Sequence, residues 1–385
     1  MAGISRGFDR EVRFGDVAYE FSVRSGAASW RDLKRRLAQL DADRFVIVAD
    51  SGLTRETVAE VESHIAAIAP STTLTVHADE KQKTLAVLGD LAERAIPTGI
   101  TRRSVVIALG GGLVGNLAGL LAALIFRGIR LVHLPTTLLG MSDSVLSLKQ
   151  AVNSSHGKNH LGTFHEPVLV WNHLDFLDTL PKPEIRSALC EMIKNVVGIV
   201  PERYDEVASL LREDAQYSTE TVTRFIDLCV DAKTKVMVKD PWEKGEALIL
   251  EYGHTIGHAA ELLTGGELLH GFAVGLGMLA AARISRELGH LDRADEEAHL
   301  ELLRRNGAPT RLPADLEIED VLATVRLDNK RGYLRDTTGK RDLILLEALG
   351  RPLRTGSKLI TQVDEDVIRL GINSIALDDV ELVVA

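Results

Sequence analysis

Three histidines and one glutamate are the residues whose types and spacing could bind a metal. His254 and His258 lie four residues apart in EYGHTIGHAAELL, so they share one face if this stretch is helical. His270 begins a later apolar stretch, and Glu191 lies in LCEMIKN. One glutamate and two histidines form a ligand set of open catalytic metal sites, although these positions are too scattered for spacing alone to establish one. The zincin pattern H-E-x-x-H is absent, because Thr255 replaces its glutamate, and ordinary core or surface histidines are the alternative.

A glycine-rich turn, VIALGGGLVGNLAG at residues 106–119, is the second chemical feature. Gly110, Gly112 and Gly115 fit G-x-G-x-x-G between an apolar strand and a helix, where backbone amides can hold a pyrophosphate. No acid follows at the usual distance of about 20 residues. Asp50 instead ends an earlier apolar stretch, which suggests a nucleotide fold whose ribose-binding strand precedes its phosphate loop. A tight turn without a ligand is the alternative.

Four lysines lie in or beside apolar or Gly/Asn-rich segments. They are Lys149, Lys158, Lys194 and Lys233. If they met in one cleft, each ammonium group would add a point charge with three donors to a phosphate site, and Arg127 in FRGI could join them. Spacing cannot establish such a convergence, and a solvated lysine is the default interpretation of each one.

The composition limits the classes of protein that the chain can form. Its 385 residues carry 55 acidic and 45 basic side chains, a formal net charge of −10, which disfavours a general nucleic-acid binder. No apolar run reaches the ~18 residues of a membrane span, and no signal pattern opens the chain, so we expect a cytoplasmic protein that binds neither nucleic acid nor membrane. Only Cys190 and Cys229 are present, so any metal must be held by histidines and carboxylates.

The predicted secondary structure that must position these residues differs between the two parts of the chain. Up to about residue 175, apolar strands alternate with helical stretches, which is typical of a mostly parallel sheet with helices on its faces. Pro181 and Pro183 mark a joint, and helical periodicity dominates after it. We therefore predict an α/β nucleotide-binding domain over residues 1–178 and a mostly α-helical domain over residues 179–385. The predicted strands are Phe45–Asp50, Thr73–His77, Ser104–Leu109, Leu131–Leu134 and Val168–Trp171, with a small hairpin near Asp342–Leu346.

Seven ordered segments resemble the sugar phosphate cyclases related to 3-dehydroquinate synthase. They are GGGLVGNLAG, FRGIRLVHLPTTLLGMSDSVLSLKQAVN, GKNHLGTFHEP, LCEMIKN, EYGHTIGHAAEL, LLHGFAVGLGM and DNKRG, and they cover nearly the whole chain. The resemblance implies the fold of that family, an NAD-binding α/β domain followed by an α-helical metal-binding domain. It also implies NAD and one divalent metal, Co²⁺ or Zn²⁺, as cofactors, a small sugar phosphate as substrate, and a homodimer.

The resemblance assigns roles to individual residues. The metal ligands fall on Glu191, His254 and His270. The catalytic residues fall on Lys149, Lys194, Glu251 and His258. Substrate and phosphate contacts fall on Arg127, Asp143, Lys158, Asn159, Lys233 and Lys330. Cofactor contacts fall on Asp50, Glu80, Lys83, Gly111, Gly112, Gly115, Asn116, Thr136 and Thr137.

Several positions depart from the 3-dehydroquinate synthases and narrow the expected substrate. Those enzymes carry an arginine for the substrate carboxylate where this chain has Ala247, so we expect a substrate without that carboxylate. They have an asparagine in place of Glu251, and they read VGGK where this chain reads LSLK, ending at Lys149. Glu251 and LSLK resemble the branch of the family that makes 2-deoxy-scyllo-inosose from glucose 6-phosphate for aminoglycoside antibiotics. Phe272 follows His270 and Gly271, and in the wider family the residue at this position is often acidic.

The reaction implied by this resemblance uses NAD as a catalyst. Oxidation at C4 of glucose 6-phosphate acidifies the C5 hydrogen, phosphate leaves from C6, C4 is reduced again, and the opened sugar closes by an intramolecular aldol step. The metal would act as a Lewis acid on a sugar oxygen at or beside C4, and Glu251 would contact a sugar hydroxyl. The alternatives are a 2-epi-5-epi-valiolone synthase acting on sedoheptulose 7-phosphate, a 3-dehydroquinate synthase, a metal-dependent alcohol dehydrogenase and an inactive nucleotide-binding protein.

Overall fold

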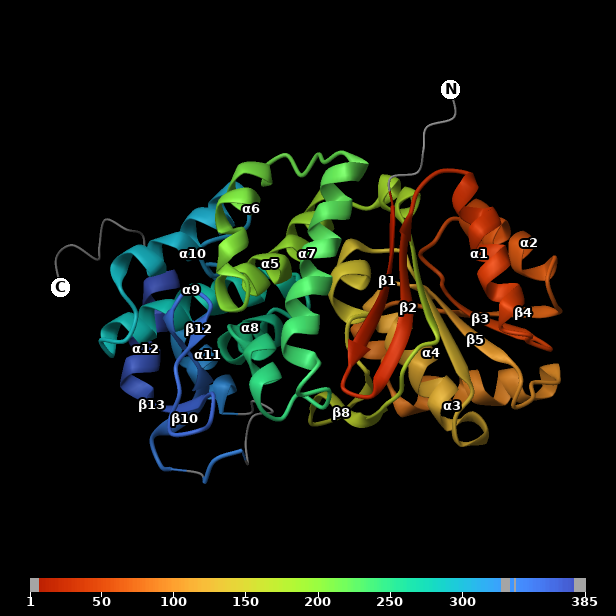
Figure 1. Cartoon of the computed structure of the whole chain (residues 1–385). Helices are drawn as coiled ribbons and strands as arrows, with labels where there is room; N and C mark the ends of the chain where they lie inside the picture. Colours follow the sequence, from red (N-terminus) through yellow and green to blue (C-terminus); the bar gives the residue numbers. More distant parts are fainter. Residues whose placement is uncertain (1–6, 327–332, 336, 377–385) are drawn as a thin grey trace. The chain divides into compact units, whose positions relative to one another are not determined.

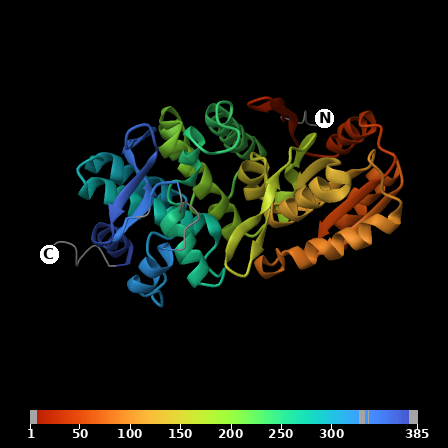
Figure 2. The ribbon, with the colours of Figure 1, turned by 90° about the horizontal axis from the view of Figure 1, so that it is seen from below.

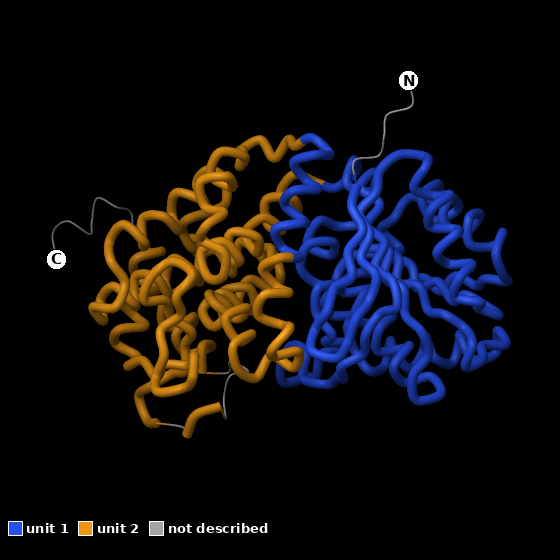
Figure 3. Tube along the Cα trace, viewed as in Figure 1, with its two compact units in different colours: residues 1–180, 218–230 blue, residues 181–217, 231–385 orange. Residues whose placement is uncertain are grey.

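The computed structural model describes residues 7–326, 333–335 and 337–376, and the chain divides into two compact units (Figure 3). Unit 1 comprises residues 1–180 and 218–230, and unit 2 comprises residues 181–217 and 231–385. The division falls within helix α7 (Thr219–Met237), whose first part is grouped with unit 1.

A seven-stranded sheet forms the centre of unit 1, in the order β1-β2-β9-β6-β5-β3-β4. Only the β1–β2 pair of this sheet is antiparallel, and the other neighbouring strands are parallel. The five strands predicted from the sequence are all present, with ends shifted by at most two residues, whereas β1 and β2 were not predicted. The strands are β1 (Phe8–Phe14), β2 (Val17–Arg24), β3 (Phe45–Asp50), β4 (Ser71–Val76), β5 (Val105–Gly110), β6 (Arg130–Pro135) and β9 (Leu169–His173).

Helices cover both faces of this sheet, so its central strands are apolar on both sides (Figures 1 and 2). Successive side chains of a strand point to opposite faces. Phe45 and Ile47 of β3 therefore pack into one core cluster, and Val46 and Val48 into another. The first cluster includes side chains of α1 (Ala28–Gln39) and α2 (Arg55–Ala66), and the second includes those of α3 (Leu85–Ala95) and α4 (Gly112–Leu124).

A second hairpin of unit 1, β7 (Lys149–Ser154) with β8 (Gly157–Phe164), was also not predicted from the sequence. The backbone N–H of Ala151 donates a hydrogen bond to Oδ1 of Asn116 in α4, at 3.1 Å. The backbone N–H of Asn153 donates to the carbonyl of Lys83, at 2.7 Å. The hairpin is therefore attached to the glycine-rich helix and to the segment after β4.

Helices dominate unit 2 (Figures 1 and 2), as the sequence predicted. β10, which contains Asp342, pairs with the distant β13, and the local hairpin follows it as β11 and β12. No helix in the described part of the chain has the length and apolar character needed to cross a membrane. The elements are α5 (Lys182–Gly198), α6 (Tyr204–Leu210), α8 (His254–Leu263), α9 (His270–Glu287), α10 (Arg293–Arg305), α11 (Ile318–Val325), α12 (Glu365–Ala376), β10 (Lys340–Ile344), β11 (Leu346–Ala348), β12 (Arg351–Pro352) and β13 (Ile360–Asp364).

Glycines allow α8 and α9 to pack with their backbones in close contact. A Cβ atom at Gly277 of α9 would lie 1.9 Å from the carbonyl oxygen of Gly253, and one at Gly257 of α8 would lie 2.7 Å from that of Ala273. Because these carbonyls belong to the backbone of the facing helix, a side chain here would force the helices apart. This close contact matters for the site, since α8 and α9 each begin with a histidine.

We predict that Gly277→Ala lowers the free energy of unfolding by about 3 kcal/mol, because the added methyl group overlaps backbone atoms. Gly89→Ala is the matched control, since Gly89 lies inside α3 with open space around the Cβ position. That change should be neutral or stabilise the protein by about 0.5–1 kcal/mol through helix propensity. Urea denaturation of both variants measures the difference, and equal stabilities would refute the packing argument.

Candidate active site

The carboxyl ends of three adjacent strands of unit 1 bring together Asp50, the glycine-rich loop and two threonines. β5 lies between β3 and β6, so Asp50 at the end of β3, Gly111 after β5 and Thr136 after β6 share one edge of the sheet. The backbone N–H of Thr136 donates to the carbonyl of Gly110 at 3.0 Å, which connects two of these loops. Ligands of open α/β sheets bind at this edge.

The glycines line a small cleft at the start of α4. Its wall includes Gly111, Gly112, Gly115 and Asn116, together with side chains of β6, of the segment that follows β6, and of β7. A Cβ atom at Gly111 would lie 3.1 Å from the side chain of Thr137. The first turn of α4 follows Gly111, which has no side chain to cap it, so its backbone amides are suited to an anion such as a pyrophosphate.

A hydrogen-bond network joins two predicted cofactor residues to a predicted substrate residue. Nζ of Lys83, a buried lysine, donates to Oδ1 of Asn159 at 2.5 Å. Asn153 donates from Nδ2 to Oε1 of Glu80 at 2.7 Å, and its Oδ1 accepts the N–H of Asn159 at 2.8 Å. Asn153 was not singled out from the sequence, and its position four residues after Lys149 carried no signal.

The other predicted site residues of unit 1 are dispersed. Lys149 and Lys158 lie near opposite ends of the β7–β8 hairpin, on the order of 10 Å apart along the strands. Asp143 is half-buried in η4 (Gly140–Ser144), a short helical segment that follows Thr136 and Thr137. The hairpin therefore does not gather its two lysines into one phosphate site by itself.

Arg127 lies beyond the far end of α4 from the glycine-rich loop. The 13 residues of this helix span about 20 Å, so the structure does not bring Arg127 to the loop of its own unit. Phe126 and Arg127 both have left-handed backbone conformations, with φ of 50° and 66°, which is strained for non-glycine residues. Arg102 stabilises this turn, because its guanidinium lies 5.4 Å from the Phe126 ring centre and donates to the Phe126 carbonyl at 2.7 Å.

Three helices of unit 2 bring the predicted metal ligands together. Oε1 of Glu191, in the middle of α5, lies 3.6 Å from Nε2 of His254 and 3.3 Å from Nε2 of His270. Two ligand atoms that each lie 2.0–2.1 Å from one tetrahedral metal are about 3.3–3.4 Å apart. The donor atoms therefore already have nearly the spacing and the chemical character that a divalent metal such as zinc or cobalt requires.

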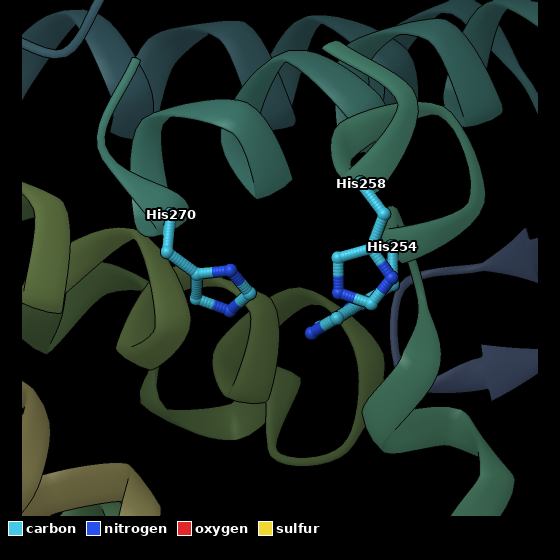
Figure 4. A group of neighbouring side chains, drawn as sticks. All are labelled: His254, His258 and His270. Carbon is cyan, nitrogen blue, oxygen red and sulfur yellow. The ribbon is translucent and has the colours of Figure 1, made fainter. Parts of the chain in front are cut away.

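His258 lies beside this ligand set. Figure 4 shows its imidazole with those of His254 and His270, and one nitrogen of each ring lies within 4.8 Å of the others. The predicted sharing of one face of α8 is confirmed, because the rings of His254 and His258 have centres 5.0 Å apart. Two sets of possible ligands therefore overlap at this place, the three histidines and the set of Glu191, His254 and His270.

Two hydrogen bonds turn the ligand nitrogens toward Glu191. Nδ1 of His254 lies 3.2 Å from the carbonyl oxygen of Tyr252, and Nδ1 of His270 lies 3.1 Å from Oε2 of Glu261. Each Nδ1–H thus has an acceptor, which leaves Nε2 available for a metal. Glu261 was not singled out from the sequence, although its spacing of seven residues from His254 places both on one face of α8.

The electrostatics of the site give the ligands suitable protonation states. Burial alone would raise the pKa of Glu191, but Lys194, which forms an ion pair with it, and the two histidines hold that pKa well below its usual range. Burial and the charge of Lys194 lower the pKa of His254 to about 4, so this ring is neutral. Desolvation would also lower the pKa of His270, but Glu191 and Glu261 outweigh it and raise the pKa to about 10. A metal would therefore replace a proton on His270.

The remaining predicted residues of unit 2 have varied surroundings. Lys233 is buried on α7, and Glu251 is half-buried at the end of the short helix η7 (Glu246–Glu251), three residues before His254. Ala247 in η7 is fully buried, so its methyl group is surrounded by protein atoms. Lys330 lies outside the described residues.

Comparisons with known proteins agree with this architecture. Residues 73–187 match the 3-dehydroquinate synthase N-terminal family, and residues 188–331 match the 3-dehydroquinate synthase C-terminal family. The 2-deoxy-scyllo-inosose synthase of Streptoalloteichus tenebrarius is 45% identical over 89% of this chain and 88% of that protein. The enzyme of the same name from Micromonospora echinospora is 43% identical over 96% of this chain and 93% of that protein.

Comparison with a solved structure shows that the fold is similar as well. A crystal structure of 2-deoxy-scyllo-inosose synthase, complexed with carbaglucose-6-phosphate, NAD⁺ and Co²⁺, superposes with a TM-score of 0.90 at 34% identity. The match covers 95% of this chain and 99% of that one, and it confirms the predicted fold class. The chain therefore belongs to the 2-deoxy-scyllo-inosose synthases, within the sugar phosphate cyclases related to 3-dehydroquinate synthase.

Proposed function

We propose that this protein converts glucose 6-phosphate to 2-deoxy-scyllo-inosose and inorganic phosphate, as a carbon–oxygen lyase of aminoglycoside antibiotic biosynthesis. The convergence of Glu191, His254 and His270 carries the proposal, in a chain 43–45% identical to two enzymes of that name. When bound, NAD supplies a hydride acceptor that is regenerated, and a divalent metal, Co²⁺ or Zn²⁺, supplies a Lewis acid. The spacing of the three donor atoms suits the metal, and the uncapped backbone amides at the start of α4 suit the pyrophosphate of NAD.

The proposed roles in unit 2 follow from burial and charge. Glu191, His254 and His270 hold the metal, and three protein ligands leave room for the sugar. Lys194 keeps Glu191 ionised through their ion pair. His258, one helical turn after His254 on the same face, moves a proton close to the leaving phosphate.

The proposed roles in unit 1 follow from the carboxyl edge of the sheet. Asp50 contacts the ribose of NAD, and the glycine loop contacts the pyrophosphate. The other cofactor contacts are Glu80, Lys83, Asn116, Thr136 and Thr137.

Lys149 has a catalytic role beside the substrate. The sugar and its phosphate are contacted by Arg127, Asp143, Lys158, Asn159, Lys233 and Lys330. Arg127 keeps this role by resemblance alone, because α4 separates it from the glycine loop.

Two positions of η7 favour glucose 6-phosphate over a substrate with a carboxylate. Ala247 offers no guanidinium for bidentate binding of a carboxylate, and its buried methyl group packs inside the protein. Glu251, four residues later, is proposed to accept a hydrogen bond from a sugar hydroxyl. The homodimer, which the resemblance implies, and the cytoplasmic location, which the composition led us to expect, remain predictions.

The first prediction is that the purified protein, given catalytic NAD and Co²⁺, releases phosphate from glucose 6-phosphate without accumulating NADH. Hydride returns to the sugar in each turnover, so absorbance at the NADH wavelength should stay flat while phosphate rises. Sedoheptulose 7-phosphate and the 3-dehydroquinate precursor, assayed in parallel, should release none. Phosphate release from only one of those two would overturn the substrate assignment, and net NADH formation would instead indicate a dehydrogenase.

A second prediction concerns Glu191→Gln. This variant should lose bound Co²⁺ and should unfold with a free energy lower by roughly 3 kcal/mol, since Lys194 would remain buried without its carboxylate. Glu184→Gln on the same helix is the control and should retain the metal. Metal analysis after gel filtration and urea denaturation measure both effects. One equivalent of Co²⁺ in Glu191→Gln would show that Glu191 is not a ligand.

A third prediction concerns Glu251→Gln, which should reduce kcat by about 100-fold while Co²⁺ stays bound. The amide keeps the size of the side chain but accepts hydrogen bonds more weakly than the carboxylate does. Glu246→Gln is the matched control, because Glu246 is an exposed residue of the same short helix that pairs with Arg354. Its phosphate-release rate should stay within about twofold of wild type. An unchanged kcat for Glu251→Gln would remove Glu251 from the reaction.

A further inference from the structure

The two histidines of the proposed metal site are held by unlike partners. His254 donates from Nδ1 to a neutral backbone carbonyl, that of Tyr252, whose phenol oxygen lies 3.0 Å from Nε2 of the buried His299. His270 instead has a carboxylate oxygen of Glu261 at 3.1 Å from its Nδ1. The first ring is therefore fixed by the backbone, and the second by one ionisable side chain.

His270 has the greater need of such a partner. It is the first residue of α9, and its side chain is 31% exposed, against 10% for His254. A ring at the first turn of a helix, with part of its surface open, can adopt several orientations unless a second contact fixes it. Glu261 is buried on α8, the helix that packs directly against α9, so the carboxylate approaches the ring from a rigid neighbour.

We propose that Glu261 is a positioning residue for His270, which orients the imidazole with Nε2 toward Glu191 and strengthens the binding of a divalent metal. The proposal rests on the metal site of the proposed function. The carboxylate accepts the Nδ1–H, which selects the tautomer with a lone pair on Nε2. Its negative charge also increases the electron density that the ring can donate to a cation, which a neutral carbonyl does less strongly.

The contacts distinguish this role from an ordinary ion pair between two helices. The same imidazole has Glu261 at one nitrogen and Glu191 at the other, so the ring connects Oε2 of Glu261 to Oε1 of Glu191 through two contacts. An ion pair that only joined α8 and α9 would not need the second nitrogen to face another ligand. Loss of Glu261 should therefore change the metal site itself.

The experiment compares Co²⁺ binding by wild type, Glu261→Ala, Glu261→Gln and the control Glu267→Gln. Glu267 is exposed and lies three residues before His270, so its variant makes the same change of charge without removing the contact. The Kd is measured by competition with a chelator, and the visible absorption of bound Co²⁺ reports its coordination. We expect Glu261→Ala to bind 10- to 100-fold more weakly, with altered absorption bands. Glu261→Gln, whose amide oxygen still accepts the Nδ1–H, should be intermediate, and Glu267→Gln should stay within about twofold of wild type.

Each of the other possible results of this experiment contradicts one specific claim. If Glu261→Ala and Glu261→Gln bind Co²⁺ as tightly as wild type, with the same spectrum, Glu261 does not position His270 and the proposed function is unaffected. If Glu267→Gln weakens binding as much, the effect comes from net charge and the proposal is wrong. If wild type itself binds no Co²⁺, the metal site of the proposed function fails, and this inference fails with it. If Glu261→Ala does not fold, the Kd of Glu261→Gln for Co²⁺ decides the question. Weaker binding than wild type supports the proposal, and an unchanged Kd contradicts it.

Discussion

The buried carboxylate of Glu191 is the constraint on which unit 2 depends. Its side chain is 1% exposed, and a buried charge costs several kcal/mol unless other charges and hydrogen bonds offset the loss of water. Lys194 supplies the opposite charge from the same helix, and His270, whose pKa is raised to about 10, supplies it from α9. The neutral ring of His254, on α8, brings Nε2 to 3.6 Å from the carboxylate. The three helices must therefore meet at one point. The glycine contacts between α8 and α9 satisfy this requirement, because they hold the two helix starts in a fixed spacing.

Unit 1 meets a different demand, since its glycine-rich loop must present hydrogen-bond donors to a ligand without a charged side chain of its own. The glycine-rich loop does this with backbone amides, and bulkier residues at Gly111 or Gly112 would contact Thr137 or Ser144. The β7–β8 hairpin then adds polar side chains, through the network of Asn153, Glu80 and Lys83. The proposed cofactor site thus depends on close backbone packing, whereas the proposed metal site depends on paired charges.

The sequence predicted the parts of this structure that have one dominant physical signal. Four of the five predicted strands, β3, β5, β6 and β9, are buried almost throughout, so each appears as an apolar run. The fifth, β4, lies at the sheet edge and buries only Leu74 and Val76, but its threonines and valine are β-branched residues that favour strands. β1 and β2 have mixed apolar and polar residues, and β8 is mostly exposed and includes Gly157 and Gly162, so neither hairpin gave that signal. The ligands Glu191, His254 and His270 came from resemblance, because residues on three helices have no fixed spacing. Glu261 did have a local signal, its place on the face of His254, but nothing in the sequence shows that His270 comes to meet it.

The turn between η7 and α8 explains how the substrate could change within this family while the metal ligands stay the same. Gly253 has a φ of 80°, and a Cβ atom there would lie 2.7 Å from Met278, so only glycine fits this position. The turn fixes His254 at the start of α8 and holds Glu251, three residues earlier, at a set distance from it. A substitution at Glu251 therefore alters a charged group that interacts electrostatically with His254. On the proposed function, substrate choice can then change through η7, because Glu191, His254 and His270 all lie on other elements, the helices α5, α8 and α9.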